Sequence, residues 1–152
     1  MSIRPRHDLV ILGGGPAGLS AAIYATRAGI TPLVIERESF GGQIVSTDEV
    51  DNYPGLVGVS GSELGERLRS HAEHLGARFV YDDVESIARA GDTGEFILRG
   101  SEEVHCSSLI YAAGAAPRRA GFAGEKEFLG RGVSYCATCD GMFYRGKHAY
   151  VI

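Results

Sequence analysis

A glycine-rich segment near the N-terminus is the feature that most constrains how this chain can fold. Gly13, Gly15 and Gly18 have the spacing Gly-x-Gly-x-x-Gly. They follow an apolar run at 8–12, which predicts a buried strand, and they precede an Ala-rich stretch at 17–28, which predicts a helix. A strand, a glycine turn and a helix in this order open a doubly wound α/β unit. With 152 residues, the chain is long enough to bury the core that such a unit needs.

The three glycines point to a dinucleotide, because each has a mechanical reason in such a site. Gly13 would permit the tight turn, Gly15 would let the backbone approach a pyrophosphate, and Gly18 would let the helix pack closely on the strand. The next apolar run, 32–36, predicts a second strand that ends at Glu36. There the Glu36 carboxylate would accept hydrogen bonds from the adenosine ribose and would disfavour a 2′-phosphate. The alternative is a tight turn that binds nothing. It is disfavoured because the first strand, the helix, the second strand and the acid at its end are all in place.

The next part of the chain predicts a second helix, a functional loop and a set of short strands. Ser60 and Glu63 form a capping box at the start of this helix. Gly76 would end it, just as Gly29 would end the first helix. The loop at 40–59 is rich in Gly, Pro, Asn and Asp and has little periodicity. The expected strands are 77–82, an antiparallel meander of 84–91, 94–99 and 102–106, and then 109–112, which returns to the parallel sheet. A meander inserted at this point favours FAD over NAD, because NAD domains usually alternate strands and helices without interruption.

Charge and hydropathy disfavour two classes of partner. The formal net charge of −4 favours neither nucleic acid nor an anionic membrane surface. No run of about 18 apolar residues is present, so the sequence predicts no membrane span. The N-terminus lacks a charged stretch followed by an apolar one, so no signal peptide is expected, and the cytoplasm is the expected compartment.

A close cysteine pair lies in the last part of the chain. Two residues separate Cys136 from Cys139, and Asp140 follows at once. In a reducing compartment such a pair is redox-active or metal-binding more often than a structural staple, and a neighbouring carboxyl group can give or take the proton that thiol–disulfide exchange needs. Zinc would need four ligands and the chain has no second pair, so the redox role is favoured over zinc and over two buried free thiols, and no metal site is expected. Cys106 and the 5 histidines are not expected to take part.

Five motifs, taken together, carry a resemblance to one family. In chain order they are Gly13-Gly-Gly-Pro-Ala-Gly18, Gly41-Gly-Gln43, Asn52-Tyr-Pro-Gly55, Ala113-Gly-Ala115 and Gly132-Val-Ser-Tyr-Cys-Ala-Thr-Cys-Asp-Gly-Met-Phe-Tyr144. From about Asp8 onward the chain resembles the N-terminal portion of the low-molecular-weight, bacterial-type thioredoxin reductases. The Cys-Ala-Thr-Cys-Asp run is highly specific to that family, whereas the other motifs are shared with flavoprotein relatives.

The resemblance implies a Rossmann-like, FAD-binding α/β fold of three layers: a parallel sheet, helices and an antiparallel β-meander. Residues 1–118 would form the N-terminal part of the FAD domain, and 119–152 would begin an NADPH and redox-disulfide domain. Electrons would pass from NADPH through FAD and a Cys136–Cys139 disulfide to thioredoxin or a similar small dithiol protein, with Asp140 as the proton donor. The FAD contacts that this implies are Gly13, Gly15, Pro16, Ala17, Gly18, Glu36, Gly42, Gln43, Asn52, Val84, Ala112, Ala113 and Gly114.

The sequence departs from the family pattern at two places. Many members have Thr at the position of Ala113, so one hydroxyl contact would be missing. The run 148–152 predicts the first strand of the NADPH domain, and the chain ends inside it, so we expect a truncated fold and no turnover with NADPH by this chain alone. Two other functions stay open, a related FAD-dependent disulfide reductase or dithiol oxidase and a non-catalytic flavin-binding fragment. The family is commonly dimeric, so a homodimer is open as well.

Overall fold

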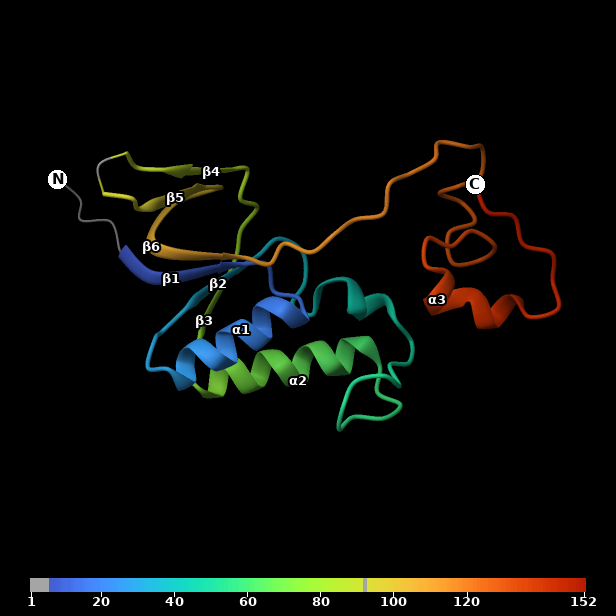
Figure 1. Cartoon of the computed structure of the whole chain (residues 1–152), viewed down its shortest axis with the longest axis horizontal. Helices are drawn as coiled ribbons and strands as arrows, with labels where there is room; N and C mark the ends of the chain where they lie inside the picture. The colour runs from blue at the N-terminus through green and yellow to red at the C-terminus, as the bar shows by residue number, and fades with distance from the viewer. Residues whose placement is uncertain (1–5, 92) are drawn as a thin grey trace. The chain divides into compact units, whose positions relative to one another are not determined.

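The computed structural model describes residues 6–91 and 93–152, without the side chains of Thr138 and Cys139. The backbone divides into two compact units, Met1–Gly114 and Ala115–Ile152. The first unit holds the strands β1 (Arg6–Leu12), β2 (Leu33–Glu36), β3 (Arg78–Tyr81), β4 (Ser86–Arg89), β5 (Phe96–Arg99) and β6 (Glu103–Tyr111), and the helices α1 (Pro16–Arg27), η1 (Gly42–Ser46) and α2 (Gly61–His74) (Figure 1). The second unit holds the short helices α3 (Ala137–Asp140) and η2 (Gly141–Tyr144).

The strands of the first unit form a mixed sheet in the order β3-β2-β1-β6-β5-β4. β1 runs parallel to both of its neighbours, so that Ile11 lies beside Val34 of β2 and Ile110 of β6. β2 is also parallel to β3, whereas β5 is antiparallel to β4 and β6. The α/β fold class, with a parallel sheet and an antiparallel meander, is therefore confirmed.

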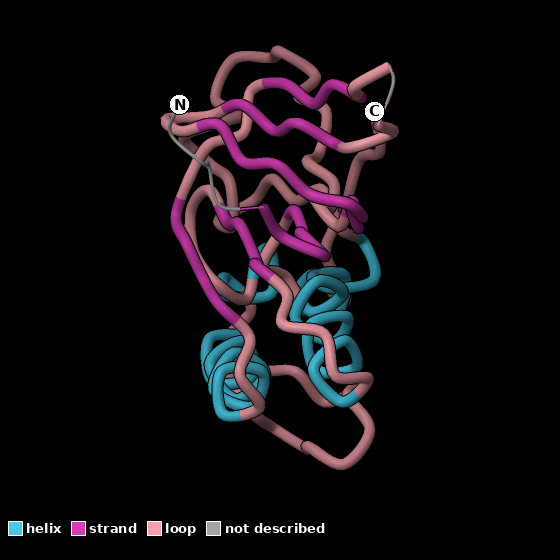
Figure 2. The backbone as a smooth tube through the Cα atoms, turned by 90° about the vertical axis from the view of Figure 1, so that its left-hand side faces the viewer, coloured by secondary structure: helices cyan, strands magenta, loops and turns pink. Residues whose placement is uncertain are grey.

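Apolar side chains fill both sides of this sheet, because successive residues of a strand point to opposite faces. Ile11 belongs to a buried cluster that includes Leu19 of α1 and Leu64 of α2. Its neighbour Val10 belongs to a second cluster, which includes Leu98 of β5. The helices lie on one side of β1 and β2, and β5 lies on the other (Figures 1 and 2). The first unit thus has the three layers that were predicted.

The two long helices begin and end near the expected residues. α2 starts with the Ser60 cap, whose Oγ accepts the N–H of Glu63 at 3.1 Å. Gly29 and Gly76 follow the last turns of α1 and α2 with φ angles of 80° and 101°. This left-handed conformation is the one that glycine adopts without strain at a helix end. Within the described residues, no helix is long and apolar enough to cross a bilayer.

The strands predicted at 102–106 and 109–112 are one continuous strand, β6. Ser107 and Ser108 interrupt the apolar pattern between them, which is why the sequence suggested a break. Both serines are exposed, so the strand can carry polar side chains there. β6 pairs with β5 at its start and with β1 over most of its length, and the ladder with β1 continues across the serines.

The strand predicted at 148–152 does not form, and that prediction was wrong. Tyr150, Val151 and Ile152 are all exposed, with relative accessibilities of 91%, 99% and 88%. A strand needs a neighbour for its backbone hydrogen bonds, and no described strand pairs with this run.

Candidate functional site

The glycine loop between β1 and α1 is too tight for side chains at its two ends. The N–H of Gly13 donates to the carbonyl of Ile35 in β2 at 2.8 Å. A β-carbon on Gly13, whose φ is 108°, would lie 2.2 Å from the carbonyl oxygen of Ala112, and one on Gly18 would lie 1.9 Å from that of Gly13. Both positions therefore require glycine, as the spacing predicted.

Gly15, in contrast, could carry a β-carbon at the N-terminus of α1 without a clash. A β-carbon there would have no neighbour nearer than 3.9 Å, and the atoms at that distance belong to Gly41 and Gly42. Pro16 opens the helix, so the amides of Ala17 and Gly18 lie in its first turn, where N–H groups lack helical partners. This is the positive end of the helix dipole, and the arrangement suits a phosphate.

Glu36 is joined directly to this loop. Its Oε2 accepts the N–H of Gly14 at 2.6 Å, and its Oε1 accepts the N–H of Glu38 at 2.9 Å. The carboxylate is half-buried at the carboxyl end of β2. It thus lies at the edge of the sheet where ligands of open α/β folds bind.

The segment after β2 folds back over the loop. The N–H of Gly41 donates to the carbonyl of Gly14 at 2.8 Å, and a β-carbon on Gly42 would lie 3.0 Å from the Cα of Gly15. α2 holds the segment through two more glycines: a β-carbon on Gly61 would lie 1.6 Å from the Ile44 carbonyl oxygen. One on Gly65 would lie 2.7 Å from the Cα of Gly41.

The contacts of Gly61 and Gly65 were missed in the sequence. A signal for Gly65 existed, because a glycine inside a helical pattern costs stability relative to alanine and therefore usually has a packing or functional reason.

The other predicted contacts lie on several elements. Ala112 follows β6 beside the glycine loop, and its N–H donates to the Leu12 carbonyl at 2.8 Å. Ala113 and Gly114 continue from it and are exposed, as is Gln43 in η1. Asn52 is exposed within the loop closed by the bridge between Val50 and Val59, and Val84 packs against the second core cluster. The carboxyl ends of β1, β2 and β6 thus gather most, but not all, of the set.

The second unit holds Cys136, which is disulfide-bonded. Its carbonyl accepts the N–H of Asp140 at 3.0 Å, so the carboxylate follows within one turn of backbone. The side chain of Cys139 lies outside the described residues. Cys106, by comparison, is a free and buried thiol of β6, and burial raises its pKa. A buried thiol of raised pKa is unreactive, which agrees with the passive role expected for Cys106.

The comparisons with known proteins decide the family. A family model described as "Pyridine nucleotide-disulphide oxidoreductase" matches residues 7–152. The chain belongs to this family. The thioredoxin reductase of Bacillus subtilis (strain 168) is 43% identical over 152 residues, which is 100% of this chain and 48% of that protein. The thioredoxin reductase of Treponema pallidum (strain Nichols) is 47% identical over 147 residues, which is 96% of this chain and 48% of that protein.

Solved structures show the same similarity to thioredoxin reductases. The crystal structure of thioredoxin reductase from Streptococcus pyogenes MGAS5005 matches with a TM-score of 0.80 and 36% identity, over 91% of this chain and 45% of that chain. The resemblance to the N-terminal portion of bacterial-type thioredoxin reductases is therefore confirmed. The chain spans about half the length of the curated relatives that it matches.

A buried carboxylate near the cysteine segment of this family member was not predicted. Glu125 accepts the N–H groups of Ala120 and Gly121, both at 2.7 Å, and the hydroxyl of Tyr135 at 2.6 Å. The Tyr135 hydrogen bond is the largest cause that lowers the pKa of Glu125, and the same bond raises the pKa of Tyr135. Glu125 thereby ties the backbone at 120–121 to the residue that precedes Cys136. The sequence holds no signal for Glu125, because no helix or strand periodicity predicts a carboxylate that bonds to residues both before and after it in the chain.

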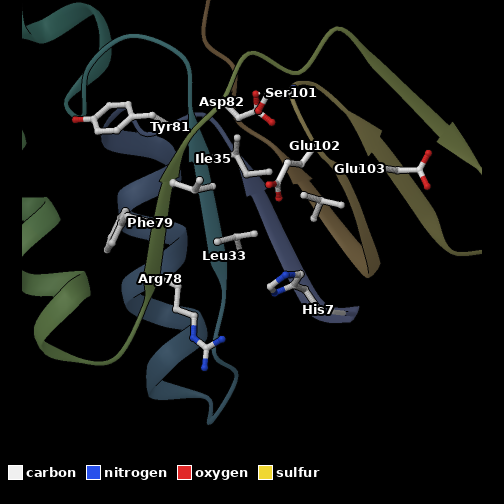
Figure 3. A pocket seen from close by; sticks show the side chains of 12 residues that line it. His7, Leu33, Ile35, Arg78, Phe79, Tyr81, Asp82, Ser101, Glu102 and Glu103 are labelled. Atoms are coloured by element: carbon white, nitrogen blue, oxygen red, sulfur yellow. Dashed lines mark hydrogen bonds between the residues drawn. The ribbon is translucent and has the colours of Figure 1, made fainter. Parts of the chain in front are cut away.

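An open groove of about 790 Å³ lies over β2 and β3 (Figure 3). His7 and Arg78 lie near one end of it, and Asp82 and Glu102 lie toward the other. Burial, and then the charge of Arg78, lowers the pKa of His7. None of the predicted site residues is among the described residues that line the groove, so it is separate from the glycine loop.

Proposed function

We propose that this chain serves in thioredoxin-disulfide reduction, in which bound FAD would relay electrons from NADPH to the Cys136 disulfide and so to thioredoxin or a similar small dithiol protein. Residues 1–118 would be the N-terminal part of the FAD domain, and 119–152 would begin the NADPH and redox-disulfide domain. A protein that reduces disulfides would act where thiols are kept reduced, so the cytoplasm is the expected location. One observation carries the proposal: the disulfide-bonded Cys136 is followed within a turn by Asp140, in a family of disulfide oxidoreductases.

The glycine loop fits the ADP end of FAD on its own geometry. The N–H groups in the first turn of α1, which begins next to Gly15, would bind the pyrophosphate. Glu36 lies where it would accept the ribose hydroxyls, although it bonds to Gly14 in this structure. The remaining contacts that we assign to FAD are Gly13, Pro16, Ala17, Gly18, Gly42, Gln43, Asn52, Val84, Ala112, Ala113 and Gly114.

Cys136 and Cys139 would form the redox pair, and Asp140 would supply the proton that a departing sulfur needs. Two intervening residues close a small ring, so the pair could open and close with little backbone motion. A cysteine in a disulfide is not the thiolate that zinc binds, and this supports the redox role of Cys136 over the metal-binding one.

The proposal is tested by trapping a mixed disulfide. Cys136→Ser and Cys139→Ser variants of this chain are each reduced and then incubated with a thioredoxin that keeps one active-site cysteine, activated as its mixed disulfide with 5-thio-2-nitrobenzoate, and are separated on non-reducing gels. The thionitrobenzoate leaves, and no second thioredoxin thiol is present to reverse the exchange. A reductase requires that one of the two variants form a covalent complex through its remaining thiol, because exchange passes through a mixed disulfide. The matched control is Cys106→Ser, which should leave the complex pattern unchanged. Failure of both single variants to capture thioredoxin would overturn the proposal.

Flavin binding is tested on the same chain. FAD added to the purified protein should change its fluorescence on binding, and an NADPH and disulfide-dye assay should show no turnover, since the sequence holds one Gly-x-Gly-x-x-Gly motif. Steady NADPH oxidation would contradict the domain assignment. With a longer form of the protein, a flavin that is bleached by NADPH and recovers only with oxygen would favour the dithiol oxidase instead.

A further inference from the structure

Ser134 links the backbone of Cys136 to the carboxylate of Asp140 at the start of α3. Its Oγ accepts the N–H of Cys136 at 3.0 Å and donates to Oδ2 of Asp140 at 2.5 Å. All three residues are half-buried, so the link is only partly open to solvent. Ser134 precedes the cysteine motif and was not among the predicted site residues.

The hydroxyl of Ser134 has one proton and two nearby acceptors. The Oγ also lies 3.3 Å from the Cys136 carbonyl oxygen, which is 0.8 Å longer than its distance to the Asp140 carboxylate. The shorter distance marks the stronger hydrogen bond, so the hydroxyl proton points to Asp140. Ser134 therefore receives one hydrogen bond from the Cys136 backbone and passes one on to the carboxylate.

We infer that Ser134 is a positioning residue for disulfide reduction, which acts by holding the Asp140 carboxyl group in place beside the Cys136 disulfide. The inference rests on the function proposed above, in which Asp140 gives a proton to a departing sulfur. Ser134 needs no contact with either sulfur for this role.

The chemical step shows why position matters. When a dithiol such as dithiothreitol reduces the disulfide, its thiolate attacks one sulfur, a new S–S bond forms and the old S–S bond breaks. The departing sulfur takes a proton from the Asp140 carboxylic acid, which becomes a carboxylate and later regains a proton from water. A second exchange releases two protein thiols and the cyclic disulfide of dithiothreitol. As the carboxylate forms, the Ser134 hydroxyl already donates to it.

A purely structural role is the competing explanation. Ser134 could serve only to accept the Cys136 N–H and so fix the turn that leads into α3. Such a role would not depend on the Asp140 side chain. A double-mutant cycle separates the two roles, because residues that act through one another are not additive.

The experiment follows the opening of the Cys136 disulfide in this chain by dithiothreitol, with thiol trapping and peptide mass spectrometry at several pH values. Asp140→Ala should slow the reaction at least as much as Ser134→Ala, which we expect to slow it about fivefold, a modest part of a typical acid–base contribution. In the Asp140→Ala background, Ser134→Ala should have no further effect. Ser134→Thr, which keeps the hydroxyl, should restore the rate to within about twofold and Ser134→Val should not.

Three results would overturn the inference. Full additivity of Ser134→Ala and Asp140→Ala would make Ser134 a structural residue, as would a Ser134→Val rate equal to that of Ser134→Thr. An unchanged pH profile in Ser134→Ala, when Asp140→Ala alters it, would also contradict the link. If Asp140→Ala itself had no effect, both this inference and the proton-donor role would fail, while the proposed reductase function would still be decided by the mixed disulfide with thioredoxin.

Discussion

The Glu36 carboxylate is bound to the backbone N–H of Gly14 at 2.6 Å, although the two residues lie 22 positions apart. The bond joins the carboxyl end of β2 to the glycine loop between β1 and α1. The acid that would hold the ribose and the loop that would hold the pyrophosphate are therefore one connected structure. Glu36 contributes to the shape of the loop, and in the proposed function it would also bind the ribose.

Glu36→Gln is predicted to weaken FAD binding about tenfold. The amide keeps the size of the side chain, but it removes the charge, and a hydrogen bond to a charged group is worth about 1.5–3 kcal/mol. Flavin fluorescence titration measures the affinity, and thermal unfolding of the flavin-free chain reports the effect on the loop separately. Glu38→Gln is the matched control, because its carboxylate pairs with Arg37 on the surface. Equal affinities for the two variants would contradict the ribose assignment.

Gly18→Ala is predicted to destabilise the first unit by about 3 kcal/mol, at the upper end of overpacking costs. The new β-carbon would lie 1.9 Å from the carbonyl oxygen of Gly13, so the loop or α1 must move. Gly91→Ala is the control, since a β-carbon there has no neighbour within 4 Å. Chemical denaturation followed by circular dichroism compares the two. A Gly18→Ala variant as stable as Gly91→Ala would show that the helix does not pack on the loop as described.

Local patterns in the sequence were enough for the elements that build the loop. The apolar run of β1, the glycine spacing and the Ser60 cap are all short-range signals, and each led to the observed element. β6 was divided in two because Ser107 and Ser108 break its apolar pattern, and only its ladder with β1 shows that it continues.

Contacts that follow no periodic pattern could not be predicted in the same way. Glu125 bonds to the backbone at 120–121 and to Tyr135, and no periodicity encodes such a set of partners. The packing of Gly65 against Gly41 is also a meeting of backbones that are far apart in sequence. Gly65 was not singled out in the sequence, and it lies inside the predicted second helix. The structure shows why glycine is needed at position 65: the backbone of the 41–47 segment lies against α2 there.

Gly65→Ala is predicted to destabilise the chain by about 2 kcal/mol, although alanine favours an isolated helix by about 1 kcal/mol. Its β-carbon would lie 2.7 Å from the Cα of Gly41, and the backbone there cannot yield as a flexible side chain would. Ser70→Ala, on the exposed face of the same helix, provides the control and should change stability by less than about 0.5 kcal/mol. Urea denaturation measures both. A stabilising Gly65→Ala would mean that α2 does not hold the 41–47 segment.

His105 is predicted to make stability depend on pH near neutrality. Its Nε2 lies 2.9 Å from Oε1 of Glu103 and its Nδ1 lies 3.4 Å from Oε2 of Glu95. The hydrogen bond with Glu103 is the largest cause that raises the pKa of His105 above 6.5, and Glu95 adds to it. Folding therefore favours the protonated imidazole. The resulting stabilisation is complete below the unfolded-state pKa of about 6.5 and is lost as the pH rises through the higher folded-state pKa.

The measurement compares the free energy of unfolding of wild type and His105→Gln across this pH range. Their difference should be largest on the acid side and should shrink as the pH rises, because only wild type loses a bound proton at this site. His7, whose pKa is lowered by burial, changes stability in the opposite sense, but it is present in both proteins and cancels. NMR titration of the His105 ring locates the folded-state pKa directly. A difference that grows with pH, or a ring that titrates below 6.5, would contradict the charge-stabilised arrangement of His105 between its two carboxylates.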